Sequence, residues 1–521
     1  MVLLPPLAHL LALVAAPQTP AAPPAPVPDI TRAELEHHVR FLASDELGGR
    51  LPGTAGMERA KAHLAEALAA AGVEPAGDDG TFFQLTGHVR VEVTAPPRLL
   101  LTHESGEVRE LVHGQDFQLR PRGRARSTEV LPLRFFYDYN HARMPLAGNA
   151  AEALYFSAQR AEKRRILKEK GIESLEDWGL ELEIRQMDDA EEPGEPGLPP
   201  SRMLAPDVTE GCELVELRGP ILADFQLRKF THVQLLVDEA ATPHVDANVV
   251  GRIRGRGTAA RAELSQEVVL LSAHYDHLGL RPRPRGPATA DALCNGADDN
   301  ASGCAALLEL AQAFASAPPA RTLVVLFTTG EESGGIGARR YLAAPAEPLA
   351  RTVGNLNLEM LGRPDELVGG AGKLWLTGWE RSNVGPAWSA QGLAIVADPR
   401  PKQSFFTRSD NYAFALEGVV AQTLSSFGEH AEYHTPRDEA DTLDYAHLEA
   451  AARVAFAAAR TLADGSLTPV WLEGQRPQRP KPPDFQRGKG EPGEEKEREL
   501  RSGRSGRTVP REPPKDPPKD D

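Results

Sequence analysis

Histidine and acidic residues stand at the ends of short apolar runs in the middle of the sequence. One histidine follows the run 268–271, and a pair of glutamates follows the run 323–327. Mixed imidazole and carboxylate ligands without cysteine suit a hydrolytic zinc, cobalt or manganese site better than a structural one. The candidate ligands are His274, Asp298 or Asp299, Glu331, Glu332, Glu359 and His434.

The sequence pattern around these residues predicts a strand, a loop, a helix and a second strand, in that order. The runs 268–271 and 323–327 are short and apolar, which is typical of buried parallel strands. Between them, the apolar residues of 304–314 recur at helical spacing. This order predicts an α/β fold with the candidate ligands at the carboxyl ends of its strands, where open sheets of this class place their sites.

Each candidate also has an ordinary role when it is taken alone. A histidine at a strand end is usually exposed or hydrogen-bonded, and Asp298-Asp299-Asn300 before a helix fits an N-cap. Adjacent glutamates are usually solvated, but Glu331 and Glu332 follow an apolar strand and precede Ser-Gly-Gly, which places them near the sheet edge. The occurrence of all these residues in one segment favours a shared metal site.

Composition and charge exclude several classes of function. The net charge of −16 and the lack of a basic stripe with interleaved aromatic residues argue against a nucleic-acid partner. Three cysteines are too few and too scattered for a zinc knuckle or a disulfide framework. Cys294 and Cys304 flank the Asp-Asp loop, and whether they pair is left open.

Composition along the chain predicts five segments. Residues 1–16 are nearly all apolar, which is typical of a secretory signal, although Arg32 is the first positive charge. We therefore expect a secreted or periplasmic protein, and no other apolar run reaches the roughly 20 residues of a membrane span. The segments are 1–28 (signal peptide and Pro/Ala-rich linker), 29–88 (start of the main domain), 89–247 (a smaller inserted α+β domain), 248–470 (core of the main domain) and 471–521 (a disordered, charged tail).

Several elements outside the candidate site follow from local pattern. Helices are expected over 34–43, 56–71 and 445–462, the last with Asp444 as its N-cap. In the inserted region we expect strands near 90–94, 130–137 and 233–237, a charged helix over 158–170, and a solvated acidic loop over 188–200.

Six motifs together resemble a known family. They occur in the family's order and are similar to the M28 family of zinc aminopeptidases, as is the start Phe41-Leu-Ala-Ser-Asp-Glu-Leu-Gly-Gly-Arg50. The resemblance covers about 30–89 and 248–464. The motifs are His274-Tyr-Asp276, Gly296-Ala-Asp-Asp-Asn-Ala-Ser-Gly303, Thr329-Gly-Glu-Glu-Ser-Gly334, Asn355-Leu-Asn-Leu-Glu-Met-Leu-Gly362, Ser409-Asp-Asn-Tyr412 and Tyr433-His-Thr-Pro436.

The resemblance implies a zinc-peptidase-like fold, with a mixed, mostly parallel central sheet covered by helices on both faces. It also implies two Zn²⁺ or other divalent ions. His274 and Glu359 would bind one ion and Glu332 and His434 the other, and Asp299 would bridge them. The family usually has Asp at position 359, so we expect retained binding with altered affinity or metal preference. The insert occupies the position of a protease-associated domain, although its sequence matches such a domain poorly.

Amide hydrolysis needs a carboxylate that does not bind the metal, and either Glu331 or Glu332 could serve as this base beside the other as ligand. The resemblance implies that Glu331 is the general base that takes the proton from the metal-activated water. Tyr433 could donate to the developing oxyanion or simply pack. Asp276 would orient His274, and Asp410 could steady the site by hydrogen bonds. For His277 a surface or structural role is expected.

The sequence thus predicts a zinc-dependent aminopeptidase acting on peptides with a free N-terminus. Two alternatives stay open. One is a single-zinc aminoacyltransferase like the glutaminyl cyclases, which use a similar scaffold. The other is a non-catalytic binding protein on the same fold. Phe405, Phe406 and Tyr412 are candidates to line a pocket for the substrate side chain, and core packing is their alternative role.

Overall fold

The computed structural model describes residues 30–120, 124–136, 152–156, 180–186, 202–204, 206, 213–280 and 291–479. The expected leader at 1–28, the charged helix at 158–170, the acidic loop at 188–200 and the tail beyond 479 lie outside these residues. No helix in the described ranges combines the length and the apolar character needed to cross a membrane.

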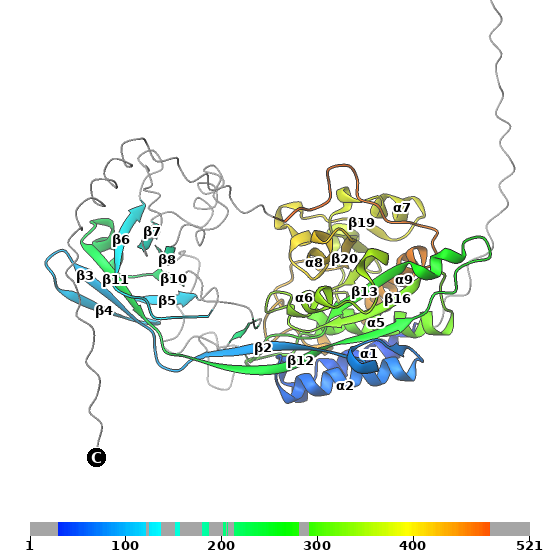
Figure 1. Cartoon of the computed structure of the whole chain (residues 1–521), viewed down its shortest axis with the longest axis horizontal. Helices are drawn as coiled ribbons and strands as arrows, with labels where there is room; N and C mark the ends of the chain where they lie inside the picture. The colour runs from blue at the N-terminus through cyan, green and yellow to red at the C-terminus, as the bar shows by residue number, and fades with distance from the viewer. Residues whose placement is uncertain are drawn as a thin grey trace, which may run out of the picture.

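A ten-stranded mixed sheet forms the centre of the larger body of the molecule (Figure 1). Its order is β19-β18-β20-β17-β13-β16-β12-β2-β9, and β1 pairs with β12 beside this path. The strands are β1 (Glu74–Pro75), β2 (Phe83–Val93), β9 (Arg202–Leu204), β12 (Glu239–Ile253), β13 (Val268–His274), β16 (Thr322–Thr328), β17 (Thr352–Leu358), β18 (Leu374–Leu376), β19 (Ile395–Ala397) and β20 (Val420–Ser425).

The middle of this sheet is parallel. Strands β20, β17, β13 and β16 run in one direction, and β18 and β19 are also parallel to each other. The other pairs of this sheet are antiparallel. The expected α/β fold with a mixed sheet is confirmed. The sheet is not mostly parallel, because the parallel pairing is concentrated in the strands that precede the candidate ligands.

Helices cover both faces of the sheet because successive residues of a strand point to opposite sides. On β13, Val269 and Leu271 pack with α1 (Arg32–Leu42), α2 (Ala55–Ala70), α5 (Gly303–Ser316), α7 (Val384–Ala390) and α9 (Tyr445–Ala463). Val268 and Leu270 pack on the other face with α6 (Ile336–Ala343) and α8 (Asn411–Leu416).

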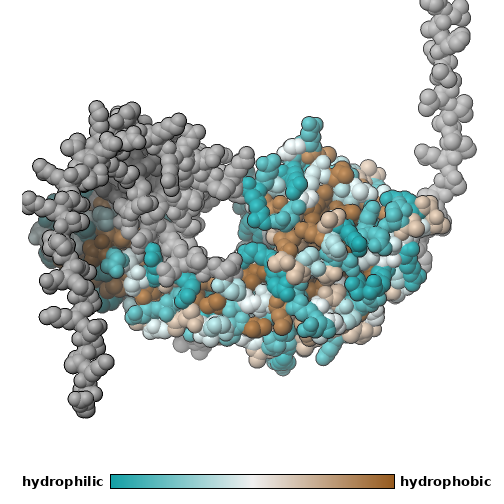
Figure 2. Space-filling model, viewed as in Figure 1, coloured by the Kyte–Doolittle hydropathy of each residue, from teal (hydrophilic) through white to brown (hydrophobic). Residues whose placement is uncertain are grey.

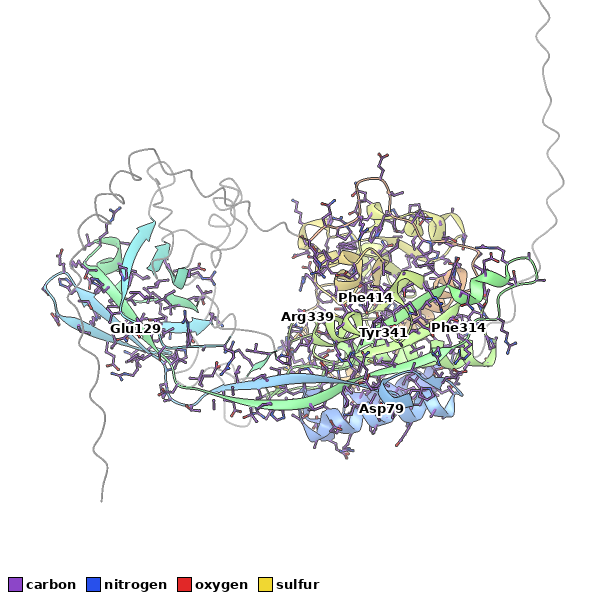
Figure 3. All side chains as sticks on the ribbon, in the orientation of Figure 1. Asp79, Glu129, Phe314, Arg339, Tyr341 and Phe414 are labelled. Atoms are coloured by element: carbon purple, nitrogen blue, oxygen red, sulfur yellow. The ribbon has the colours of Figure 1, made fainter. Side chains whose placement is uncertain are left out.

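Local details of these helices agree with the sequence. The predicted helices 34–43, 56–71 and 445–462 correspond to α1, α2 and α9. Asp444 caps α9 by accepting the backbone N–H groups of Ala446 and His447. Tyr341 on α6 and Phe414 on α8, both labelled in Figure 3, meet edge to face with ring centroids 6.0 Å apart.

A second, eight-stranded sheet builds the smaller body, with the order β4-β3-β11-β6-β7-β8-β10-β5. It has its own apolar cluster, which includes helix α4 (Ile221–Gln226). Figure 1 shows β2 and β12 as a long antiparallel ribbon that leads toward it, so the predicted limits of the insert at 89 and 247 fall inside these two strands. The strands are β3 (Arg98–His103), β4 (Val108–Val112), β5 (Phe117–Arg120), β6 (Leu131–Phe136), β7 (Glu152–Phe156), β8 (Leu180–Gln186), β10 (Glu213–Leu217) and β11 (Phe230–Leu236).

The visible face of the larger body carries many polar residues. Figure 2 shows hydrophilic residues in teal over much of its visible face, with hydrophobic residues in brown gathered near the middle.

A short hairpin of β14 (Gly279–Leu280) and β15 (Leu293–Cys294) follows β13 and completes the described strands.

Candidate metal centre

The parallel strands bring the candidate ligands to one edge of the sheet. His274 is the last residue of β13, and Glu359 follows directly after β17. Glu332 follows β16, and His434 lies in the loop after β20. The carboxyl ends of parallel strands share one edge of a sheet, so residues far apart in the sequence become neighbours there.

His274, Asp299 and Glu359 form one group of possible ligands. Each offers an atom within 4.8 Å of the others. The Nε2 atom of His274 lies 3.2 Å from Oδ1 of Asp299. The structure therefore brings together the three residues that were expected to hold the first ion.

His434 and Glu332 lie on the other side of Asp299. The Nε2 atom of His434 is 3.0 Å from Oδ2 of Asp299 and 3.2 Å from Oε1 of Glu332. The carboxylate of Asp299 thus lies between the two histidines, with one oxygen toward each.

Asp298 faces elsewhere, and this separates the two aspartates that the sequence left open. Its carboxylate accepts the backbone N–H of Gly362 at 2.7 Å. It also lies 3.1 Å from Nε2 of His430 and 3.2 Å from a nitrogen of Arg363. Since these partners satisfy Asp298, it is Asp299 that remains directed at the two candidate ligand histidines.

For His277 a surface or structural role was predicted. Its side chain is completely buried, which excludes a surface role, and the structural role stays a prediction. Its Nδ1 lies 2.9 Å from Oε1 of Glu332, and with Asp299 and Glu332 it forms a second group of atoms within 4.8 Å. The signal in the sequence was its position three residues after His274.

The donor set fits a divalent cation. Among the described residues, the buried atoms Nε2 of His274, Nδ1 of His277 and Oε1 of Glu332 have no aligned hydrogen-bond partner. Burying polar atoms without partners costs free energy, and a metal ion would satisfy them. Imidazole nitrogens and carboxylate oxygens without thiolate are suitable ligands for zinc at a catalytic site.

The carboxylates of the site differ strongly in the direction in which their pKa values are shifted. Burial would raise the pKa of Asp299, but its contacts with His274 and His434 hold it well below its usual range. Burial and the charge of Asp299 would also raise the pKa of Glu332, yet the nearby imidazoles lower it to about 2. Burial raises the pKa of Glu359 to about 7. The contacts with the imidazoles thus favour the ionised forms of Asp299 and Glu332.

Of the adjacent glutamates Glu331 and Glu332, only Glu332 belongs to a group of possible ligands. Glu331 belongs to neither group. Burial raises its pKa well above the ordinary value, and the charges of Glu359 and Glu332 add to this rise, although His274 opposes it. A raised pKa suits a group that must accept a proton and then release it near neutral pH.

Asp276 contacts His274 differently from the expected arrangement. Nδ1 of His274 lies 3.3 Å from the backbone carbonyl oxygen of Asp276 and 3.8 Å from its carboxylate. The carboxylate instead accepts the backbone N–H groups of Glu331 at 3.1 Å and Glu332 at 3.4 Å. Asp276 therefore connects the end of β13 to the glutamate loop.

Asp410 and Tyr433 also lie beside the site. Asp410 is buried and accepts a hydrogen bond from the hydroxyl of Thr328, the last residue of β16. The ring of Tyr433 stacks on His434 with centroids 3.8 Å apart. Their roles in steadying the site and in donating to an oxyanion stay predictions.

The cysteines near the site are not joined. Cys294 and Cys304 are both buried and carry free thiols. The thiol of Cys304, on α5, donates to the backbone carbonyl of His274 at 3.0 Å. Cys304 thus packs beneath the first candidate ligand, and the open question of a disulfide is answered.

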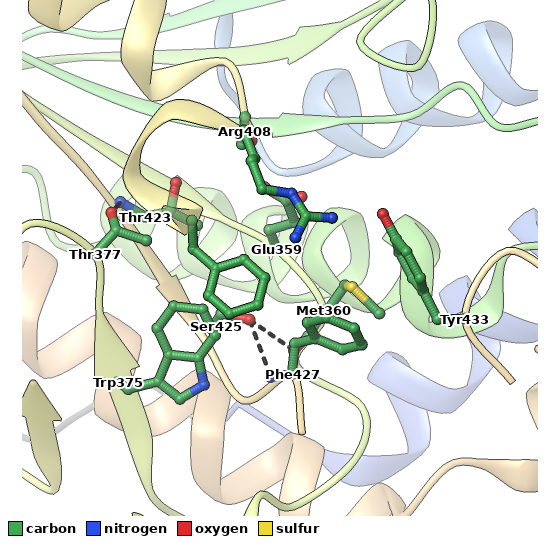
Figure 4. Close-up of a pocket in the computed structure, with 11 residues that line it drawn as sticks. Glu359, Met360, Trp375, Thr377, Arg408, Thr423, Ser425, Phe427 and Tyr433 are labelled. Atoms are coloured by element: carbon green, nitrogen blue, oxygen red, sulfur yellow. Dashed lines mark hydrogen bonds between the residues drawn. The ribbon is translucent and has the colours of Figure 1, made fainter. Parts of the chain in front are cut away.

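A pocket opens beside Glu359, as Figure 4 shows. Of the three aromatic residues proposed for such a pocket, Phe405 lines it. Phe406 packs in the core instead, and Tyr412, on α8, is half-buried against the same cluster. The lining residues are Glu359, Met360, Trp375, Thr377, Phe405, Arg408, Ser409, Thr423, Ser425, Phe427 and Tyr433.

Comparison with known proteins identifies relatives of the larger body. Residues 248–459 match the model of peptidase family M28. A probable zinc metalloprotease of Leptosphaeria maculans is 33% identical over 133 residues, which are 25% of this chain and 28% of that protein. A vacuolar membrane protease of Penicillium rubens is 29% identical over 188 residues, 35% of this chain and 17% of that protein. The matched segment thus spans less than a third of these relatives.

A solved structure shows the same fold over most of the chain. The aminopeptidase from Aneurinibacillus sp. strain AM-1 superposes with a TM-score of 0.54 at 17% identity. The superposition covers 87% of this chain and 97% of that one. Because only 17% of the residues are identical, this superposition is evidence for a shared fold alone.

Proposed function

We propose that this chain, whose residues 248–459 belong to peptidase family M28, is a two-zinc aminopeptidase that removes residues from the free N-termini of peptides. Peptidases of this family are zinc-dependent hydrolases. The number of ions, the roles of single residues and the preference for free N-termini are the parts proposed here.

One observation carries the two-metal proposal. The oxygens of Asp299 lie 3.2 Å from Nε2 of His274 and 3.0 Å from Nε2 of His434. Glu359 completes the first set of ligands, and Glu332 completes the second, with His277 beside it. A shared carboxylate with a histidine on each side suits a pair of ions, whereas a single ion would leave one histidine unused.

The residues of the chain divide the chemistry between them. Zinc would supply Lewis acidity, which lowers the pKa of water and polarises the scissile carbonyl. Glu331 takes the proton from the attacking water and delivers it to the leaving amine. Asp276 holds the backbone of Glu331 and Glu332, so that one glutamate stays a base while its neighbour stays a ligand. Tyr433 donates to the developing oxyanion.

The test is an assay of purified protein on aminoacyl arylamides and on the same compounds with blocked amino groups. Activity should be confined to free amino groups, disappear on chelation, and return with zinc. Metal analysis should give two zinc ions per chain. Cleavage of blocked substrates alone would refute the aminopeptidase proposal, and full activity with one ion per chain would refute the two-metal proposal.

A further inference from the structure

We infer that the pocket beside Glu359 binds a carboxylate, and that the enzyme therefore prefers peptides that begin with Asp or Glu. This inference rests on the proposed aminopeptidase function, because it assigns the pocket to the side chain of the N-terminal residue. The pocket shares Glu359 with the candidate metal centre. A side chain bound in the pocket would therefore place the peptide bond that follows its residue beside that centre.

Arg408 supplies the positive charge of the pocket. Its guanidinium lies 4.9 Å from the centre of the Phe405 ring, and both residues line the pocket. Figure 4 shows the guanidinium and the hydroxyl of Tyr433 on the same side of the pocket, near Glu359. The aromatic ring supports the guanidinium in this position, and its planar set of donors matches a carboxylate.

No acidic residue in the described ranges forms an ion pair with Arg408. The neighbouring arginines differ in this respect, since Arg400 pairs with Asp365 and Arg381 with Glu380. Glu359 is the acidic residue that lines the pocket, and the proposed metal site uses its carboxylate. An arginine in a pocket without its own acidic partner favours a negatively charged ligand.

The uncharged polar groups of the pocket also favour an acceptor. The indole N–H of Trp375 is buried and has no hydrogen-bond partner among the described residues. The hydroxyl of Thr377 accepts the backbone N–H of Thr423 at 2.8 Å, and so keeps its own hydrogen for donation.

The hydroxyls of Thr423 and Ser425, which could accept a hydrogen bond from a ligand, already have partners within the protein. Thr423 donates to Asn411 at 2.9 Å and accepts from Asn357 at 3.2 Å. Ser425 accepts from the backbone N–H of Phe427 at 3.1 Å. The pocket thus offers more free donors than free acceptors, which suits a carboxylate better than an ammonium or an amide.

The apolar walls define the rest of the ligand. Trp375 and Phe405 have ring centroids 5.3 Å apart, and Phe427 stands 5.8 Å from Phe405. Such walls contact the methylene groups of a short acidic side chain. A basic side chain brings its charge toward Arg408 and is excluded by repulsion.

The test compares hydrolysis of the 4-nitroanilides of Glu and Gln, which have nearly the same shape and differ in charge. The zinc-loaded full chain should show a kcat/KM about 2- to 5-fold higher for Glu, the range for one ion pair at a residue that is exposed in the free protein, as Arg408 is. In Arg408→Met this ratio should fall to near one, and Arg408→Glu should favour Lys-4-nitroanilide.

Arg381→Met is the matched control. Arg381 also lies over a phenylalanine, 4.7 Å from the ring centre of Phe406, but it does not line the pocket. This variant should keep the Glu to Gln ratio of the unmodified enzyme. Loss of the ratio in both variants would overturn the assignment to Arg408.

A carboxylate could also come from the C-terminus of a dipeptide, so Ala-Ala is compared with Ala-Ala amide. The enzyme could discriminate between Ala-Ala and its amide through Arg408 and yet show no preference for Glu over Gln. That result would overturn the inference about acidic N-terminal residues. Equal rates for Glu and Gln would also overturn it, while hydrolysis of any free aminoacyl anilide would leave the proposed aminopeptidase function intact. If no anilide is cleaved, both proposals fail.

Discussion

The carboxylate of Asp438 accepts the backbone N–H of Asp299 at 3.0 Å, and also that of Asp298. Asp438 is completely buried, and its other strong partner is Arg363 at 2.8 Å. One side chain, 139 residues further along the chain, therefore holds the backbone from which the proposed bridging ligand projects. This connection makes Asp438 a positioning residue for the metal centre.

Replacing Asp438 should weaken metal binding without removing a ligand. In Asp438→Ala two buried N–H groups lose their acceptor, and we expect zinc affinity to fall about 10- to 100-fold, as for other residues that support metal ligands. Zinc titration against a chelating indicator measures this. Asp441→Ala is the control, since Asp441 is exposed and pairs with Arg40. Equal affinities in both variants would contradict the positioning role.

Glu331→Gln should separate catalysis from metal binding. Gln keeps the size of the side chain but cannot accept the proton, so kcat should fall by about 10²- to 10⁴-fold. Zinc content, measured by atomic emission, should stay that of the unmodified protein because Glu331 belongs to neither group of possible ligands. Loss of zinc in this variant would assign Glu331 to the ligands instead.

The two histidines near Glu332 should differ in their effect on metal content. Nε2 of His434 contacts both Asp299 and Glu332, so His434→Ala should lose one zinc per chain. Nδ1 of His277 contacts Glu332, and His277→Gln should retain two ions with affinity reduced about 10- to 100-fold. The reverse pattern of stoichiometry would make His277 the ligand.

Arg50 should be essential for stability although it touches no substrate. It is completely buried, and it donates to the backbone carbonyls of Leu42, Tyr275, Asn295 and Gly296. Arg50→Met leaves these acceptors without a donor, and we expect a loss of about 3 kcal/mol or more in the free energy of unfolding. Urea denaturation measures it.

Arg50→Lys provides the graded comparison for this prediction. Lysine keeps the charge but cannot reach four carbonyls with the fixed geometry of a guanidinium, so its stability should lie between that of the Met variant and the unmodified protein. A Met variant as stable as the unmodified protein would show that the four carbonyls find other donors.

Glu309 should make stability depend on pH far from the active site. Burial, with the charge of Glu34, raises its pKa from an ordinary 4.5 to about 7. Between these values the folded chain holds a proton that the unfolded chain releases, so this residue lowers stability as pH rises through the window. Glu309→Gln should therefore be more stable than the unmodified protein at pH 8, by about 1 kcal/mol after allowance for solvent screening, and equal to it near pH 4.5.

Thermal unfolding of both proteins at the two pH values measures this difference. His38, whose Nε2 lies 3.9 Å from Glu309, and its neighbour His63 have a pKa lowered to about 4 by burial, so they reduce stability as pH falls below about 6.5. At pH 8 both histidines are neutral in the folded and the unfolded chain, so they do not contribute to the difference at that pH. A difference that does not change with pH would contradict the titration of Glu309.

Much of the fold and the types of the site residues could be predicted because they depend on local pattern. The apolar run before His274 predicts a buried strand, and that strand is β13. The N-cap of α9 at Asp444 depends only on residues within the first turn of that helix. The limits of the insert could not be placed in this way, because β2 and β12 continue through them without a change of element.

The sequence by itself determined which side chains are available and at which strand ends they stand. Tertiary structure decided which of them meet: it turned Asp299 rather than Asp298 toward the histidines, buried His277 beside Glu332, and placed Asp438 beneath the loop. The physical reason is that local periodicity records which face of an element a residue occupies. Distances between remote residues depend on how strands align and how loops are held by partners such as Arg50, and no local pattern contains that information.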